Sequence, residues 1–130
     1  MIESEENNMK RILPNDIYRD LPCSVVAVGC AKGITIRSEA KKLLSDELKQ
    51  NGYLSLNGMN TLVRANCDVI KTEQYKRSER PELREFAHQN EGKKAVICVL
   101  GHYVYFDGHN YHSFFFNGGD KVVKVWYLKE

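Results

Sequence analysis

Three side chains in this sequence could together catalyse a hydrolysis in which a thiol is the nucleophile. They occur in the order cysteine, histidine, asparagine. Cys23 follows a proline and opens an apolar run, His102 follows a glycine in the C-terminal third, and Asn117 begins a later turn. A thiol acts as a nucleophile when its pKa is depressed, a base lies within hydrogen-bond reach and a third group orients that base. We therefore predict a nucleophile at Cys23, a base at His102 and an orienting group at Asn117.

The place of Cys23 at the start of a helix favours a reactive thiol. Pro22 suits the first turn of a helix and Gly33 is a typical C-terminal stop, so we expect a helix over residues 23–32. Unpaired backbone N–H groups and the helix macrodipole favour a thiolate at such an N-terminus. The competing interpretation is that Cys23 is a small buried apolar residue. We expect the other cysteines to be structural: Cys30, Cys67 and Cys98.

Two residues compete for the position beside His102. Side chains alternate along a strand, so an even hairpin loop at residues 107–110 brings one set of side chains to the face of His102: Tyr111, Ser113, Phe115 and Asn117. An odd loop would instead bring His112 there. We expect the even loop and therefore Asn117, with His112 as the alternative third member. His102 could also be a half-buried histidine whose ring is satisfied by a backbone carbonyl.

The pattern around these residues is helical first and extended second. Besides the first helix we expect helices over residues 36–51 (capped by Thr35), 59–65 and 82–89. β-Branched and aromatic runs predict strands over residues 95–100, 103–106, 111–116 and 122–128, with a brief extended segment at 67–70. We expect a flexible tail over residues 1–12 and a single α+β domain over residues 13–130.

Composition excludes several other classes of protein. The 19 basic and 17 acidic residues are interspersed and give a formal net charge of +2, so we expect neither nucleic acid nor a membrane as a partner. No window approaches the roughly 18 consecutive apolar residues of a membrane span, and the N-terminus is not a secretory signal, so we expect a cytoplasmic protein. No C-x-x-C pair is present, and we expect no metal and no cofactor. A weaker alternative is a metal site formed by four side chains: Cys23, Cys98, His102 and His112.

Four segments carry a resemblance to a known family: residues 21–27 around Cys23, residues 81–86, the strand 101–108 around His102, and the turn 117–120. Together they resemble the papain-like cysteine peptidases, and most nearly the small bacterial and phage members of that superfamily. The resemblance covers roughly residues 15–128. It implies N-terminal helices packed on a C-terminal antiparallel sheet and a Cys-His-Asn site at Cys23, His102 and Asn117.

The implied activity is hydrolysis of an amide or isopeptide bond. The substrate would be a peptide or protein, with a peptidoglycan peptide as one candidate. Papain relatives usually place an oxyanion-hole glutamine before the nucleophile, and this chain has none there. Asn15 is the only neutral amide in that region, so we expect it to serve with the backbone N–H of Cys23. If His112 replaced Asn117, the closer analogy would be the cell-wall amidases with a Cys-His-His site.

The alternative function is that of a catalytically inactive papain-like binding module. The missing glutamine favours it, and so does the absence of the aromatic residue that often follows the nucleophile. A set of aromatic residues could form a protein-binding face: Tyr103, Tyr105, Tyr111, Phe114 and Phe116. The competing explanation for these aromatics is packing between strands of the sheet.

Overall fold

The computed structural model describes residues 11–130, which form an α+β fold with five α-helices and a six-stranded mixed sheet. The helices are α2 (Cys23–Lys32), α3 (Arg37–Lys41), α4 (Asp46–Asn51), α5 (Leu56–Asn66) and α6 (Leu83–Gln89), with 3-10 turns η1 (Asp16–Tyr18) and η2 (Arg77–Glu79). The strands are β1 (Arg11–Ile12), β2 (Val69–Gln74), β3 (Ala95–Val99), β4 (His102–Phe106), β5 (Tyr111–His112) and β6 (Val122–Leu128).

The sheet has the order β1-β5-β4-β3-β6-β2, and every pair is antiparallel except β1 with β5. The predicted C-terminal antiparallel sheet is therefore confirmed for β3 to β6, while β2 and β1 add an earlier strand at each edge. The even hairpin loop is also confirmed, because Phe106 pairs with Tyr111 across the four residues 107–110. Asp107 closes this loop by accepting hydrogen bonds from the backbone N–H groups of His109 and Asn110.

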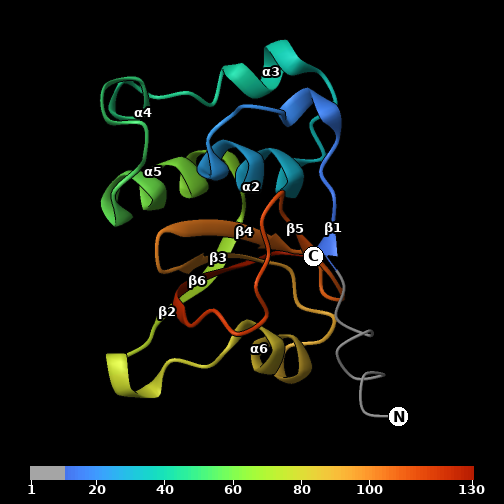
Figure 1. The fold of residues 1–130 in the computed structure, drawn as a ribbon, viewed down its shortest axis with the longest axis vertical. Coiled ribbons are helices and arrows are strands. Elements are labelled where there is room, and N and C mark those ends of the chain that lie inside the picture. Colours follow the sequence, from blue (N-terminus) through green and yellow to red (C-terminus); the bar gives the residue numbers. More distant parts are fainter. Residues whose placement is uncertain (1–10) are drawn as a thin grey trace.

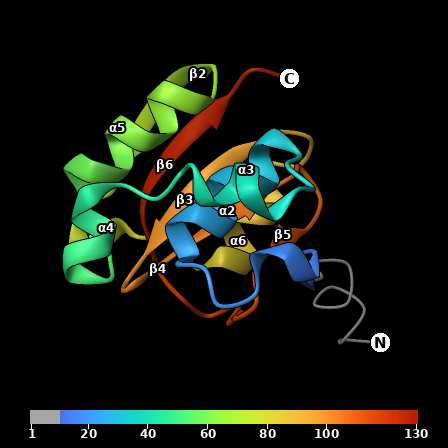
Figure 2. The same ribbon diagram turned by 90° about the horizontal axis from the view of Figure 1, so that it is seen from above.

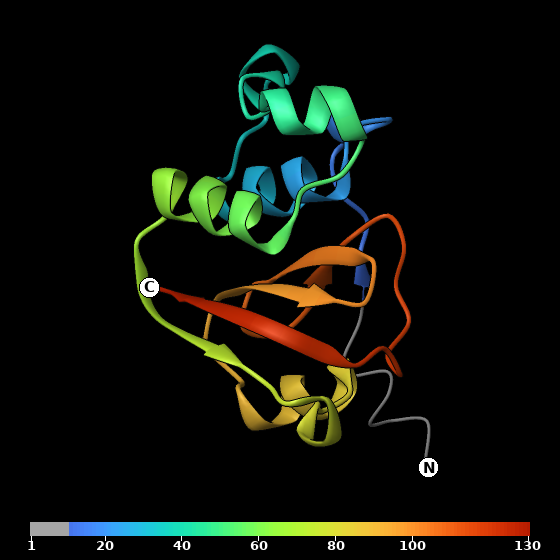
Figure 3. The same cartoon turned by 90° about the vertical axis from the view of Figure 1, so that its left-hand side faces the viewer.

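Helices cover both faces of the sheet (Figures 1 and 3). Helices α2 and α5 lie on one face with α3 and α4 beyond them, and α6 lies on the other face. Figure 2 shows α2 crossing the strands, and α2 makes its main sheet contacts with β4. The first face buries Trp126, whose indole N–H donates to the Asn60 side chain at 3.0 Å and so joins β6 to α5. The second face buries Phe86 against Phe106.

The predicted bounds of helix α2 are confirmed. Its packing requires a glycine at position 29. Gly33 ends the helix in the left-handed conformation at φ 70°, which glycine adopts without strain. Gly29 lies under the buried ring of Tyr18, and a Cβ at Gly29 would lie 2.7 Å from the Tyr18 hydroxyl oxygen. That hydroxyl donates to the carbonyl of Ile34. The close approach therefore fixes η1 and the segment leading to Cys23 against α2.

The predicted single helix over residues 36–51 is wrong, because the chain forms two short helices there. Helix α3 ends at Lys41, and Ser45 begins α4 by accepting from the N–H of Leu48 at 3.2 Å. Ser45 favours the break, because its hydroxyl caps a new helix by accepting from the N–H of Leu48. Ala40, Leu43 and Leu48 are all buried in the core. The helical periodicity and the terminal Asn51-Gly52 were still informative, since α4 ends at Asn51.

Other expectations also change at the ends of elements and at the aromatic residues. Arg11 and Ile12 belong to β1 rather than to the predicted tail, and the rest of that tail lies outside the described residues. Strand β5 ends at His112, four residues earlier than predicted. The proposed aromatic binding face does not exist as such, because Tyr103, Tyr105 and Tyr111 are buried and Phe114 and Phe116 are half-buried. These rings take part in the packing of the domain, as the competing explanation held.

Candidate functional site

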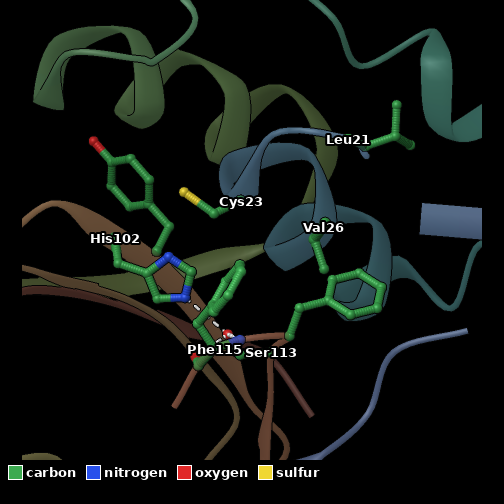
Figure 4. Close-up of a pocket in the computed structure, with 8 residues that line it drawn as sticks. Leu21, Cys23, Val26, His102, Ser113 and Phe115 are labelled. Carbon is green, nitrogen blue, oxygen red and sulfur yellow. Dashed lines mark hydrogen bonds between the residues drawn. The ribbon is translucent and has the colours of Figure 1, made fainter. Parts of the chain in front are cut away.

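Cys23 and His102 line one small cavity between the start of α2 and the start of β4 (Figure 4). The cavity has a volume of about 50 Å³, and its other walls are mostly apolar: Leu21, Val26, Tyr103, Ser113, Phe114 and Phe115. Both Cys23 and His102 are half-buried. The packing of α2 against β4 thus brings together two residues that are 79 positions apart in the sequence.

The ring of His102 is held at its Nε2 atom by Ser113, which lies just beyond β5. The Nε2–Oγ distance is 2.8 Å, and the Ser113 side chain is buried. Ser113 Oγ also donates to the carbonyl of Phe115 and accepts from the N–H of Phe115 at 3.2 Å. Figure 4 shows that the other ring nitrogen, Nδ1, lies on the side of the ring that faces the Cys23 sulfur. The thiol and Nδ1 therefore face each other in the cavity.

Burial shifts both residues toward their neutral forms. It raises the pKa of Cys23, and hydrogen bonds from the backbone of Tyr103, Ser24 and Cys23 itself act in the opposite direction. Burial also lowers the pKa of His102 from 6.5, while hydrogen bonding to the backbone of Phe115 and the charge of Asp120 raise it. The expected depression of the Cys23 pKa is therefore not found, because desolvation outweighs the helix N-terminus. The resting site holds a thiol beside a neutral imidazole.

The other three cysteines have the features of structural residues. Burial raises the pKa of Cys30 to about 12 and that of Cys98 to about 11. Burial also raises the pKa of Cys67, with the nearby Lys32 acting to lower it. All four cysteines of the chain are free thiols.

Asn117 does not occupy the predicted position on the His102 ring. It lies beyond the end of β5 and uses its side-chain oxygen to accept from the N–H of Gly119 at 2.9 Å. It does share an open groove of about 580 Å³ with His102, Arg11 and Asp120. The side chain hydrogen-bonded to His102 is that of Ser113 instead. The strand alternation was correct, but β5 ends before it could place Asn117 on the ring.

His112 and Asn15 also have other partners. His112 Nε2 lies 2.8 Å from the Asp107 carboxylate, at the hairpin and not at the His102 ring. Asn15 is exposed and caps η1, where its side-chain oxygen accepts from the N–H of Ile17 at 3.1 Å. It is not among the residues that line the Cys23 cavity. The amide expected to complete an oxyanion hole is thus engaged elsewhere.

Ser113 is a site residue that the sequence pattern did not single out. Strand alternation put Ser113 in the same set as Asn117, and the hairpin register, if continued, offsets both residues equally from the position opposite His102. A serine hydroxyl can also accept a hydrogen bond from an imidazole N–H. The sequence did not reveal that β5 ends at His112.

Residues 11–130 hold no group of three or more His, Cys, Asp or Glu side chains arranged to bind a metal ion. In the same part of the chain no helix has the length and apolar character needed to cross a membrane. Comparisons with protein-family models, with curated proteins and with solved structures found no match.

Proposed function

We propose that this protein is a cysteine hydrolase that cleaves an amide or isopeptide bond in a peptide or protein. The observation that carries the proposal is the shared cavity of Cys23 and His102, with Nδ1 of the ring facing the sulfur and Nε2 held by Ser113. A nucleophile next to an oriented base is the arrangement that covalent acyl transfer requires. The packing of a helix that begins at the cysteine against the histidine strand supports a papain-like arrangement.

The reaction follows from the neutral resting pair. Nδ1 of His102 takes the thiol proton of Cys23 as the sulfur attacks the substrate carbonyl carbon. The C–N bond then breaks, the leaving amine receives that proton, and a thioester remains on Cys23. His102 next takes a proton from water, whose oxygen attacks the thioester and releases the carboxylic acid. The proton returns to the sulfur, which restores the resting site.

The developing oxyanion needs hydrogen-bond donors, and the start of α2 offers them. The backbone N–H of Cys23 lies in the first turn of a ten-residue helix, where N–H groups have no partner within the helix. We assign the oxyanion to this amide without Asn15. The open groove next to His102 would hold the substrate chain, and Arg11 and Asp120 give it one cationic and one acidic side chain. A reducing, cytoplasmic location fits a reaction that needs a free thiol at Cys23.

A binding module without turnover is the second candidate function. Two observations favour it, namely the raised pKa of Cys23 and the engagement of Asn15 at η1. Two exposed apolar residues also lie near His102. Leu100, two positions earlier in the sequence, is 72% exposed, and Phe115, whose ring contacts the His102 ring, is 76% exposed. Such a surface would bind a partner through apolar contacts with no chemistry at Cys23.

Labelling with an electrophilic cysteine-protease probe distinguishes the two functions. We expect the probe to modify Cys23 in preference to Cys30, Cys67 and Cys98, as mapped by mass spectrometry. Cys23→Ala should abolish the labelling. His102→Ala should slow it by about a hundredfold or more, which is the usual contribution of a general base.

Two matched variants serve as controls. Cys30→Ala removes a half-buried thiol from the same helix, and His109→Ala removes an exposed histidine from the hairpin loop, so both should label like the wild type. Equal labelling of all four cysteines, or unchanged labelling of Cys23 in a folded His102→Ala variant, would contradict the hydrolase and favour the binding module.

A further inference from the structure

The geometry points to Ser113 as the positioning residue that holds His102 in the tautomer with the proton on Nε2. This inference rests on the proposed function, in which Nδ1 of His102 is the base. It goes beyond that function by naming the side chain that makes Nδ1 available. Asn117, the expected orienting residue, is engaged with Gly119.

The hydrogen bonds at Ser113 Oγ determine the direction of its bond to His102. A serine hydroxyl has one proton to donate and two lone pairs that accept. The proton is used by the carbonyl of Phe115, which can only accept. One lone pair accepts from the N–H of Phe115 at 3.2 Å. The remaining lone pair faces Nε2 at 2.8 Å, so Nε2 must be the donor in that contact.

The opposite direction of the Ser113–His102 hydrogen bond is unfavourable. If Ser113 instead donated to Nε2, its oxygen would face the Phe115 carbonyl oxygen with no proton between them. Two oxygen lone pairs at hydrogen-bond distance repel each other. A neutral ring with its proton on Nε2 therefore has its lone pair on Nδ1, which faces Cys23.

Strand β1 keeps Ser113 in this position although β5 has ended. The carbonyl of Ile12 accepts from the N–H of Ser113 at 3.2 Å, and the Arg11 guanidinium donates to the carbonyl of Phe114 at 2.6 Å. The Ser113 side chain is only 2% exposed, so water cannot compete for its hydroxyl. The same short segment is thus tied to β1 through its backbone and to His102 through its side chain.

Nitrogen-15 NMR of the histidine rings tests the tautomer directly. We would record long-range ¹H–¹⁵N spectra of the wild-type protein at about pH 8, above the ordinary histidine pKa. His102→Gln identifies the His102 signals. We expect a protonated Nε2 and an unprotonated Nδ1, and the opposite pattern would overturn the inference. This measurement needs no turnover and no Ser113 variant.

Variants then test whether Ser113 is the cause. Ser113→Ala should give a mixture of the two His102 tautomers and slow probe labelling of Cys23 in proportion to the fraction of rings with a protonated Nδ1, about twofold for an equal mixture. Ser113→Thr keeps the hydroxyl and should restore most of both properties. Ser55→Ala is the matched control, since it removes a helix-capping hydroxyl that does not line the cavity of His102 and should leave the tautomer unchanged.

The outcomes separate this inference from the proposed function. An unchanged tautomer and an unchanged labelling rate in Ser113→Ala would overturn the role of Ser113. A tautomer shift in Asn117→Ala but not in Ser113→Ala would do the same and return the role to Asn117. A protonated Nε2 together with no labelling of wild-type Cys23 would overturn the hydrolase and still support the tautomer assignment.

Discussion

At the scale of single residues, desolvation shifts the pKa values of Cys23 and His102 in opposite directions. Burial raises the pKa of Cys23 and lowers that of His102, so both changes disfavour a thiolate–imidazolium pair at rest. In the proposed mechanism, the reactive thiolate then forms only as the proton moves to Nδ1 of His102. A neutral pair also explains how an apolar cavity can hold both groups, since burying two charges in it would cost several kcal/mol.

The lowered pKa of His102 sets the pH dependence of the site. The base must be neutral, so probe labelling of Cys23 should fall on acidification with a midpoint below the ordinary 6.5. Asp120 acts in the opposite direction, because its negative charge favours the imidazolium. Asp120→Asn should therefore move the midpoint to still lower pH. Labelling rates between about pH 4 and pH 8 test both statements, and a wild-type midpoint above 6.5 would contradict the burial argument.

At the scale of elements, the nucleophile is positioned by the fit between α2 and the segment before it. Gly29 allows the ring of Tyr18 to lie directly on the helix, and the Tyr18 hydroxyl reaches the carbonyl of Ile34 just after α2 ends. The segment before Cys23 is thus anchored to the C-terminal end of α2. On the other side, α2 packs on β4, which begins at His102.

Gly29→Ala should destabilise the protein despite the higher helix propensity of alanine. The added methyl group meets three atoms of the buried Tyr18 ring and hydroxyl, and such overpacking costs about 1–3 kcal/mol. The gain from helix propensity is only about 1 kcal/mol. Urea denaturation measures the net change in the free energy of unfolding.

Gly58→Ala in α5 is the matched control. A Cβ there meets mainly the end of the flexible Glu47 side chain and one methyl group of Leu54, which can both move. We expect its free energy of unfolding to be no lower than that of the wild type, with a gain of up to about 1 kcal/mol from helix propensity. Equal stabilities of the two variants would show that the Tyr18 contact does not constrain α2.

At the scale of the whole molecule, the sheet separates a functional face from a supporting one. The face covered by α2 and α5 contains Cys23 and its cavity, and the face covered by α6 is a closed apolar core around Phe86. The ring of Phe86 packs on Phe106 and Tyr127, with centroid distances of 5.8 and 6.1 Å. Stability and reactivity should therefore respond to different substitutions.

Phe86→Ala and Phe115→Ala test this separation. Phe86→Ala removes a fully buried ring and should lower the free energy of unfolding by about 3–5 kcal/mol. Labelling of Cys23 in the remaining folded protein should stay within about twofold of the wild type, since α6 lies on the far face. Phe115→Ala removes an exposed ring from the cavity wall, so it should change labelling and cost less than about 0.5 kcal/mol. A large loss of labelling in folded Phe86→Ala would contradict the separation.

Much of the architecture follows from local sequence signals. Pro22 and Gly33 delimit α2 because one residue suits the first turn of a helix and the other adopts a positive φ. The β-branched runs give β3 and β6, and the loop at residues 107–110 sets the hairpin register. These are short-range properties of the chain. The order of Cys23 and His102, and their placement at the start of a helix and of a strand, also follow from the sequence.

The tertiary structure decided what depends on contacts between distant segments. Where β5 ends depends on its pairing with β1, and this end determines that Ser113 rather than Asn117 meets His102. The pKa of Cys23 depends on how deeply α2 packs into the sheet, so desolvation reversed the shift expected from the helix N-terminus alone. Local sequence determined the elements and their chemistry, whereas burial and partner choice required the assembled fold, because both depend on residues far apart in the chain.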